Sequence, residues 1–144
     1  MSKIDSFSGE YRFLSNFYPC QVTLDNETYP SVEHAYQAAK TLDMEERTVL
    51  RTTGPANIVK KLGRRVTVRS DWESVKIEIM SDLVWQKFSN NTELKNKLLD
   101  TGDCELVEGN WWNDTFWGVC NGRGHNYLGQ ILMAVRNELK NLHM

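Results

Sequence analysis

The sequence has little proline, little cysteine and no long apolar run. Its three prolines are scattered, and no linker rich in proline or glycine divides the 144 residues. We therefore expect one domain over residues 1–144, a length sufficient to bury a proper hydrophobic core. The cysteines are odd in number and form no Cys-x-x-Cys pair, which argues against a disulfide framework and a zinc clip; they are Cys20, Cys104 and Cys120.

An excess of charge of one sign is also missing. Lys and Arg number 17 and Asp and Glu number 19, for a formal net charge of −2. This balance excludes a generally basic nucleic-acid-binding surface, although Arg64, Arg65 and Arg69 can form one small patch. No stretch approaches the roughly 20 apolar residues that span a bilayer, and the N-terminus lacks the apolar core of a signal peptide. The sequence therefore predicts a cytoplasmic protein.

The apolar periodicity predicts an α+β fold, a single helix-rich domain with a few short strands. Ser31 is the expected N-cap of one helix, Asp43 with Glu46 has the spacing of a capping box for the next, and Asn126 is expected to cap the last. The expected elements are an irregular or short-strand segment in the first 18 residues, a hairpin over 21–29, helices that begin near residues 32, 43, 55, 72, 92 and 126, an extended piece over 64–69, and a short strand at 106–107.

Glu33 lies in the first turn of the helix that Ser31 begins. An acid at this position ordinarily compensates the helix macrodipole. Gln37 and Lys40 share its face, however, and a partly buried carboxylate beside such groups can stabilise a cation that develops during a reaction. The sequence leaves both interpretations open.

Trp72 and Lys76 are one turn apart at the start of the longest expected helix, so their side chains are neighbours. In the ordinary interpretation the tryptophan belongs to the core and the lysine is solvated. In the functional interpretation an aromatic face stacks on a planar base beside an amine. Lysine becomes a nucleophile when burial or nearby cations lower its pKa, and Lys40 is the second candidate for such an amine.

The segment from Asn110 to Gly118 holds three tryptophans without helical or strand periodicity. Asp114 lies among these aromatic residues. A carboxylate in such surroundings can act as a general acid or base. The alternative is a loop that fills the core and whose aspartate caps a backbone turn.

Metal and nucleotide motifs are weak. His34, His125 and His143 are scattered, and we expect no metal site. Gly122-Arg123-Gly124 follows no clear strand, so the Rossmann interpretation fails on context, and there is no Walker A loop.

Five motifs occur in an order that resembles the NADAR family, whose best-known branch is YbiA-like. Together they extend from residue 13 to residue 129. The motifs are residues 13–17 (FLSNF), 31–40 (SVEHAYQAAK), 71–76 (DWESVK), 106–110 (LVEGN) followed by ND at 113–114 and WG at 117–118, and 126–129 (NYLG). The pair Trp111-Trp112 departs from the more polar residues of relatives.

The resemblance implies an N-glycosidase that hydrolyses the bond between a ribose carbon and a base-like nitrogen. One branch of the family acts on phosphoribosylamino-pyrimidine intermediates of riboflavin biosynthesis, and another removes ADP-ribose from guanine, including guanine in DNA, which reverses ADP-ribosylation. By resemblance, the catalytic residues are Glu33, Lys76 and Asp114, and the residues near the substrate are Asn16, Phe17, Trp72, Trp117 and Gly118. The chemistry requires no metal or redox cofactor, and we expect no membrane or obligate protein partner.

Three questions stay open at this stage. The first rival is a non-catalytic ADP-ribose or nucleotide reader, which would not need both Glu33 and Asp114. The second rival is a nucleic-acid-binding module, against which the net charge argues. Within the enzyme hypothesis, Lys76 can add to the ribose carbon of a ring-opened substrate and form a Schiff base, or water can attack that carbon directly.

Overall fold

The computed structural model describes residues 2–142, whose contacts group into two compact units. The first unit contains the N-terminal segment up to Ser15 and the chain from Phe88 onward, and the second unit runs from Asn16 to Lys87. Both units are built mainly from helices with a few short strands, which confirms the predicted α+β class. The expectation of one domain over residues 1–144 remains a prediction.

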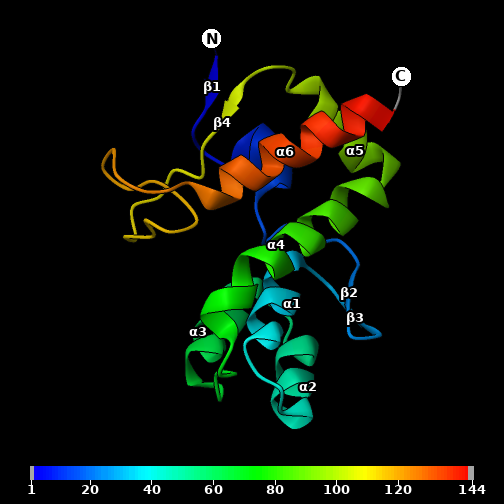
Figure 1. Ribbon diagram of the computed structural model, residues 1–144, viewed down its shortest axis with the longest axis vertical. Helices are drawn as coiled ribbons and strands as arrows, with labels where there is room; N and C mark the ends of the chain where they lie inside the picture. Colours follow the sequence, from blue (N-terminus) through cyan, green and yellow to red (C-terminus); the bar gives the residue numbers. More distant parts are fainter. Residues whose placement is uncertain (1, 143–144) are drawn as a thin grey trace. The chain divides into compact units, whose positions relative to one another are not determined.

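The second unit begins with a hairpin and continues with helices (Figure 1). Its antiparallel strands pair Val22 with Tyr29, and both turn residues, Asp25 and Asn26, have positive φ angles, as two-residue hairpin turns require. The predicted hairpin is thereby confirmed. The elements are β2 (Val22–Leu24), β3 (Glu27–Tyr29), α1 (Val32–Ala39), α2 (Met44–Thr52), α3 (Ala56–Leu62), the 3-10 turn η2 (Gly63–Arg65) and α4 (Trp72–Ser89), which belongs to this unit up to Lys87.

Helix α1 is the centre of the second unit. Every residue from Val32 to Ala39 is buried, and the helix packs against α2, α3 and the hairpin. The Ser31 hydroxyl accepts a hydrogen bond from the backbone N–H of His34 at 3.1 Å, which confirms the predicted N-cap. A helix that is buried on all sides must satisfy each polar side chain locally, and this places strong demands on its acidic residue.

The capping box predicted for α2 is half right. Asp43 accepts hydrogen bonds from the N–H groups of Glu45 and Glu46, as an N-cap should. The return bond from Glu46 is not formed, because its carboxylate accepts hydrogen bonds from Thr41 Oγ1 at 2.6 Å and Thr67 N at 3.0 Å instead. Glu46 therefore ties the chain near Thr67 to the start of α2.

The extended piece predicted over residues 64–69 is partly wrong, because Arg64 and Arg65 belong to a 3-10 turn, whereas the backbone of Val66 is extended. The chain forms the turn η2 and then an irregular segment, in which Val68 is 55% exposed. No neighbouring strand pairs with the Val66 and Val68 alternation among the described residues. Instead, Arg69 N donates to Lys40 O at 2.6 Å, which fixes the start of α4 near the end of α1.

The first unit contains a parallel strand pair and two longer helices (Figure 1). Lys3 lies opposite Glu105, and the predicted short strand at 106–107 is confirmed with a shift of one residue. Helix α6 packs against α5 and β4. The elements are β1 (Lys3–Ile4), the 3-10 turn η1 (Gly9–Leu14), α5 (Thr92–Asp100), β4 (Glu105–Leu106) and α6 (Tyr127–Leu142).

Asn126 does not act as the predicted side-chain cap of α6. Its Oδ1 accepts from Glu108 N at 2.9 Å, and its Nδ2 donates to Leu106 O at 2.9 Å. The side-chain amide thus binds the backbone of residues 106 and 108 instead of an N–H group in the first turn of α6. Asn126 therefore holds the beginning of the long loop of residues 107–126 against the beginning of the helix that follows it.

Candidate active site

Glu33 is a buried acid on the central helix of the second unit. Its residue is 7% exposed, and Gln37 Nε2 donates a hydrogen bond to its carboxylate at 2.6 Å. Burial raises the pKa of Glu33, whereas the Gln37 hydrogen bond and the positive charges of Lys60, Lys40 and His34 lower it. Compensation of the helix macrodipole does not explain a carboxylate that is removed from water and surrounded by cations.

Asn16 is bonded to the first turn of the Glu33 helix, and Phe17 follows Asn16 in the chain. Glu33 N donates to Asn16 O at 3.0 Å, and Asn16 Nδ2 contacts Met80 Sδ at 3.5 Å. Phe17 is 40% exposed, and Lys60 Nζ lies 6.0 Å from its ring centroid. This segment therefore brings a partly exposed aromatic ring to the start of the Glu33 helix, and Lys60 of α3 lies over that ring.

Trp72 packs against the same helix. Its ring centroid is 5.2 Å from that of Tyr36 at an interplanar angle of 53°, and the residue is 7% exposed. Lys40 Nζ lies 5.8 Å from the centroid of the Tyr36 ring. Trp72 is thus buried, as the core interpretation predicts, and its indole packs against the Tyr36 ring.

Lys76 and Lys40 differ in their surroundings. Lys76 Nζ donates to Glu73 Oε1 at 2.8 Å, and the Lys76 side chain is 15% exposed. Burial lowers the pKa of Lys40, the Glu33 charge raises it, and the charges of Arg64, Lys76 and Lys60 lower it further. A carboxylate therefore engages Lys76, whereas Lys40 lies among like charges.

Lys60 and Arg64 lie outside the five sequence motifs, yet the charge of Lys60 acts on Glu33 and the charges of both act on Lys40. The turn between them passes Gly63, where a Cβ atom would collide with Gln37 Oε1. The turn therefore approaches α1 closely at Gly63, and a side chain at this position would displace the Gln37 amide. The sequence signal was the four-residue spacing of two basic residues, which alone does not reveal which helix they approach.

His34 joins two helices of the second unit through its ring nitrogens. Its Nε2 donates to Thr53 O at 2.7 Å, and its Nδ1 is 2.6 Å from the Ser31 hydroxyl. These bonds join the start of α1 to the end of α2. Within residues 2–142, no group of three or more histidine, cysteine, aspartate or glutamate side chains is arranged to hold a metal ion, and His143 lies outside the described residues.

Asp114 organises the loop of the first unit. Its Oδ1 accepts hydrogen bonds from Phe116 N at 3.1 Å and Trp117 N at 2.9 Å. Asn110 binds the Asp114 backbone on both sides, with Oδ1 accepting from N at 3.0 Å and Nδ2 donating to O at 2.9 Å. This is the backbone-capping role that the sequence left open as the alternative to acid–base chemistry.

The aromatic residues of this loop divide into an exposed pair and a packed group. Trp111 is 84% exposed and Trp112 is 43% exposed, and their rings meet edge to face at 5.5 Å. Trp117 packs edge to face on Phe116 at 4.8 Å. The buried Gly118 admits no Cβ atom, because one would collide with Glu108.

The predicted site residues therefore fall in two groups. Phe17, Glu33, Trp72 and Lys76 lie with Asn16 in the second unit. Asp114, Trp117 and Gly118 lie together in the loop of the first unit. Within the second unit, Tyr36 contacts Trp72, and Asn16 is bonded to Glu33.

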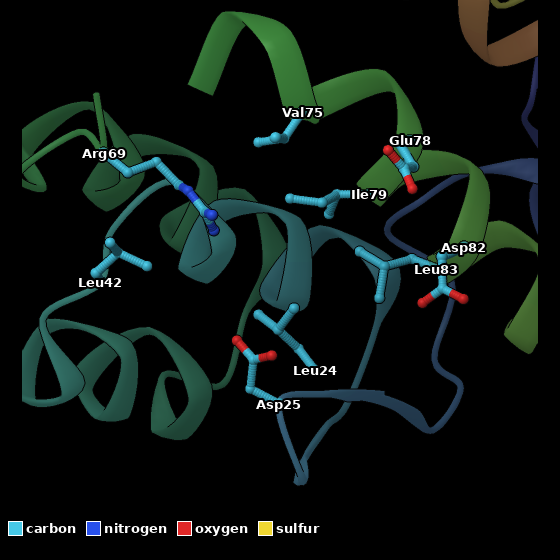
Figure 2. A pocket seen from close by; sticks show the side chains of 9 residues that line it. All are labelled: Leu24, Asp25, Leu42, Arg69, Val75, Glu78, Ile79, Asp82 and Leu83. Carbon is cyan, nitrogen blue, oxygen red and sulfur yellow. The ribbon is translucent and has the colours of Figure 1, made fainter. Parts of the chain in front are cut away.

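A cavity of about 380 Å³ in the second unit contains none of the predicted site residues (Figure 2). Its floor is apolar, and its carboxylates come from the hairpin and from α4. Arg69 is engaged by Asp71 at 2.6 Å, and Asp25 by Arg47 at 2.7 Å. The remaining acidic rim repels a phosphorylated ligand. Its lining residues are Leu24, Asp25, Leu42, Arg69, Val75, Glu78, Ile79, Asp82 and Leu83.

Comparison with known proteins gives one consistent result. The model of the NADAR domain matches residues 5–140. The N-glycosidase YbiA of Shigella boydii is 37% identical over 137 residues, which cover 93% of this chain and 85% of that protein. The NMR structure of YbiA from E. coli has a TM-score of 0.86 and 35% identity, and the match covers 99% of this chain and 89% of that chain.

A riboflavin biosynthesis protein of Vibrio vulnificus is 44% identical over 132 residues. The match covers 89% of this chain and 35% of that protein, so this chain spans about a third of its length.

The chain belongs to the NADAR family. Because it matches YbiA proteins over most of both lengths, it is a hydrolase that acts on N-glycosidic bonds. None of the helices within residues 2–142 is both long and apolar enough to cross a bilayer.

Proposed function

We propose that this enzyme cleaves the ribosyl C–N bond of a phosphoribosylamino-pyrimidine, with Glu33 at the reacting carbon. The observation that carries this proposal is a buried carboxylate that accepts a hydrogen bond from Gln37 and lies beside cations. All three cysteines are free, which supports a cytoplasmic enzyme.

The chemistry of the bond explains the choice of Glu33. When the bond between the ribose C1 and the nitrogen breaks, both electrons go to the nitrogen and positive charge develops on the sugar. A fixed carboxylate in a poorly solvated site stabilises that charge. Water then forms the new bond to C1 and loses a proton, while the leaving nitrogen gains one.

The resemblance implies that Asp114 is catalytic, and its place among aromatic residues in the sequence suggests a general acid or base. Its Oδ1 accepts two backbone hydrogen bonds in the loop, so only a proton on Oδ2 would leave both intact. A role in holding the loop of Trp117 and Gly118 is therefore favoured, with the substrate contacts of those two residues still implied by the family.

The pyrimidine substrate is supported by the Vibrio vulnificus relative, which is named for riboflavin biosynthesis. ADP-ribosylated guanine in nucleic acid is a second candidate substrate. The exposed rings of Trp111 and Trp112 favour it, because exposed aromatic faces stack on unpaired bases.

Mass spectrometry of products tests both substrates side by side. The protein is incubated with the phosphoribosylamino-pyrimidine and with an ADP-ribosylated guanine oligonucleotide, and the released base is measured. We expect release from the pyrimidine. Release of guanine alone would contradict the pyrimidine substrate and indicate an enzyme that removes ADP-ribose from guanine. Binding of either compound without release would support a non-catalytic ADP-ribose or nucleotide reader.

A further inference from the structure

Positive charge outnumbers negative charge around Glu33. Lys40, Lys60 and Arg64 come from α1, α3 and η2, and the charges of Lys60 and Arg64 both act on Lys40. Lys76 adds to this positive field, although Glu73 binds its ammonium group. The end of α1 and the continuous segment of α3 and η2 thus bring cations together beside one buried acid.

Contacts with aromatic rings support this arrangement. Lys40 Nζ is 5.8 Å from the centroid of Tyr36, and Lys60 Nζ is 6.0 Å from that of Phe17. Arg64 follows Lys60 by four residues, the spacing that places two side chains on one side of a helical turn. Arg64 is exposed, while Lys40 and Lys60 are half-buried, so the cations extend from the solvent toward Glu33.

The half-buried ammonium group of Lys40 is repelled by the like charges around it. The neighbouring cations and burial together lower the pKa of Lys40, against the opposing effect of Glu33. A bound anion would relieve this repulsion and accept charge-assisted hydrogen bonds from the neighbouring cations. A phosphoryl group has the charge and the three acceptor oxygens for this position.

Gln37 provides a complementary buried acceptor. It is 4% exposed, and its Oε1 has no hydrogen-bond donor among the described residues. The close approach of this oxygen to Gly63 places it at the turn that carries Lys60 and Arg64. A phosphoryl group cannot donate to Oε1 when ionised, but a hydroxyl of the ribose that bears it can.

We propose that Lys40, Lys60 and Arg64 bind the phosphoryl group on the ribose 5′ oxygen of the substrate. This inference rests on the proposed N-glycosidase function and adds the residues that make the enzyme require phosphate. A phosphate monoester and the diphosphate of ADP-ribose both present this group, so both are tested.

Calorimetry with the full chain provides the first test. The probes are ribose 5-phosphate, ADP-ribose and unphosphorylated ribose. We expect ribose 5-phosphate to bind at least about tenfold more tightly than ribose, because several charge-assisted hydrogen bonds are added. Added salt should weaken the binding of ribose 5-phosphate and leave that of ribose unchanged. Comparison with ADP-ribose identifies whether monoester or diphosphate is preferred.

A matched pair of double variants provides the second test. Lys60→Gln with Arg64→Gln should lower the affinity for ribose 5-phosphate by about tenfold or more and spare that for ribose. Lys61→Gln with Arg65→Gln removes the same two charges from neighbouring exposed positions and should change neither affinity. All four residues are at least partly exposed, so both variants should fold.

The outcomes separate this inference from the proposed function. Phosphate-selective binding without turnover of any N-ribosyl substrate would support the anion site and contradict the proposed reaction. Turnover with equal kcat/KM for phosphorylated and unphosphorylated substrates would contradict the anion site and leave the reaction standing. Equal losses in the two double variants would also overturn it, because general charge would then explain the binding.

Discussion

Two carboxylates were candidates for chemistry, and their surroundings differ. Glu33 lies on a buried helix, where a side-chain amide and nearby cations surround it. Asp114 lies in an irregular loop, where its oxygen accepts hydrogen bonds from two backbone N–H groups. The local structure of the loop depends on Asp114, whereas α1 is capped by Ser31 and does not need Glu33.

Asp114 thus stabilises the local structure of its loop, whereas the burial of Glu33 destabilises the folded state. A short polar side chain in a turn satisfies orphan backbone groups and stabilises the loop. A buried glutamate pays a desolvation penalty, and Gln37 returns only part of it. Buried ionisable groups of this second kind are typical of functional sites.

The replacement Glu33→Gln should have the largest effect. We expect kcat to fall by about 100-fold or more, the usual scale for a lost electrostatic stabiliser, because the amide keeps the shape and loses the charge. Steady-state kinetics on the phosphoribosylamino-pyrimidine measures it, with circular dichroism as the folding control. Near-full activity in a folded variant would remove Glu33 from the mechanism.

Lys76 should have a smaller effect. Because Glu73 accepts a hydrogen bond from its Nζ, we expect Lys76 to contact the substrate as an ammonium group while water attacks the ribose. Lys76→Met should lower kcat/KM by about tenfold, the value of one hydrogen bond to a charged group.

Borohydride added during turnover distinguishes the two routes for Lys76. A Schiff base would be reduced to a stable ribosyl adduct that peptide mass spectrometry detects on Lys76. We expect product without an adduct. An adduct, together with an inactive Lys76→Met variant, would establish the covalent route instead.

Asp114 should tolerate an amide but not truncation. Asp114→Asn keeps the Oδ1 acceptor for Phe116 N and Trp117 N, so its activity should stay within about tenfold of the wild type and its loop intact. Asp114→Ala should lose about 1 kcal/mol of unfolding free energy, the usual value of a cap. Equal and large losses of kcat in both variants would show that Asp114 transfers a proton.

Local patterns predicted the fold where a residue interacts with its own neighbours. Ser31 caps the helix that it precedes, and the hairpin turn follows from Asp25 and Asn26. The prediction failed where a distant partner decides the structure. The Glu46 carboxylate accepts a hydrogen bond from Thr67 N instead of completing a capping box. Residues 66–69 pair with no neighbouring strand among the described residues, and Arg69 N donates to Lys40 O.

The site follows the same rule. Glu33, Gln37 and Lys40 lie on one helix, so their proximity could be read from spacing. The approach of Lys60 and Arg64 could not, because it depends on the packing of Gly63 against Gln37. The exposure of Trp111 was also unpredictable, since an aromatic-rich loop is equally compatible with a core.

The smallest expected effect is on the pH dependence of the unfolding free energy. It measures most directly how much the burial of ionised Glu33 destabilises the folded state. Burial raises the folded-state pKa of Glu33 above its unfolded value, so Glu33 costs the fold no ionisation energy below the unfolded pKa. Between the two pKa values the unfolded chain releases a proton that the folded chain keeps, and stability falls as pH rises through this window. Linkage gives about 1.4 kcal/mol for each tenfold difference in proton affinity.

Glu33→Gln removes this loss because glutamine does not titrate. The variant should therefore gain unfolding free energy relative to the wild type as pH rises from 4 toward neutrality, as measured by urea denaturation at each pH. Glu45→Gln, at an exposed first-turn position of α2, controls for the lost interaction with a helix dipole and should show no such gain. A difference between Glu33→Gln and wild type that stays constant with pH would mean that burial does not hinder the ionisation of Glu33, and the contrast with Asp114 would then lose its energetic basis.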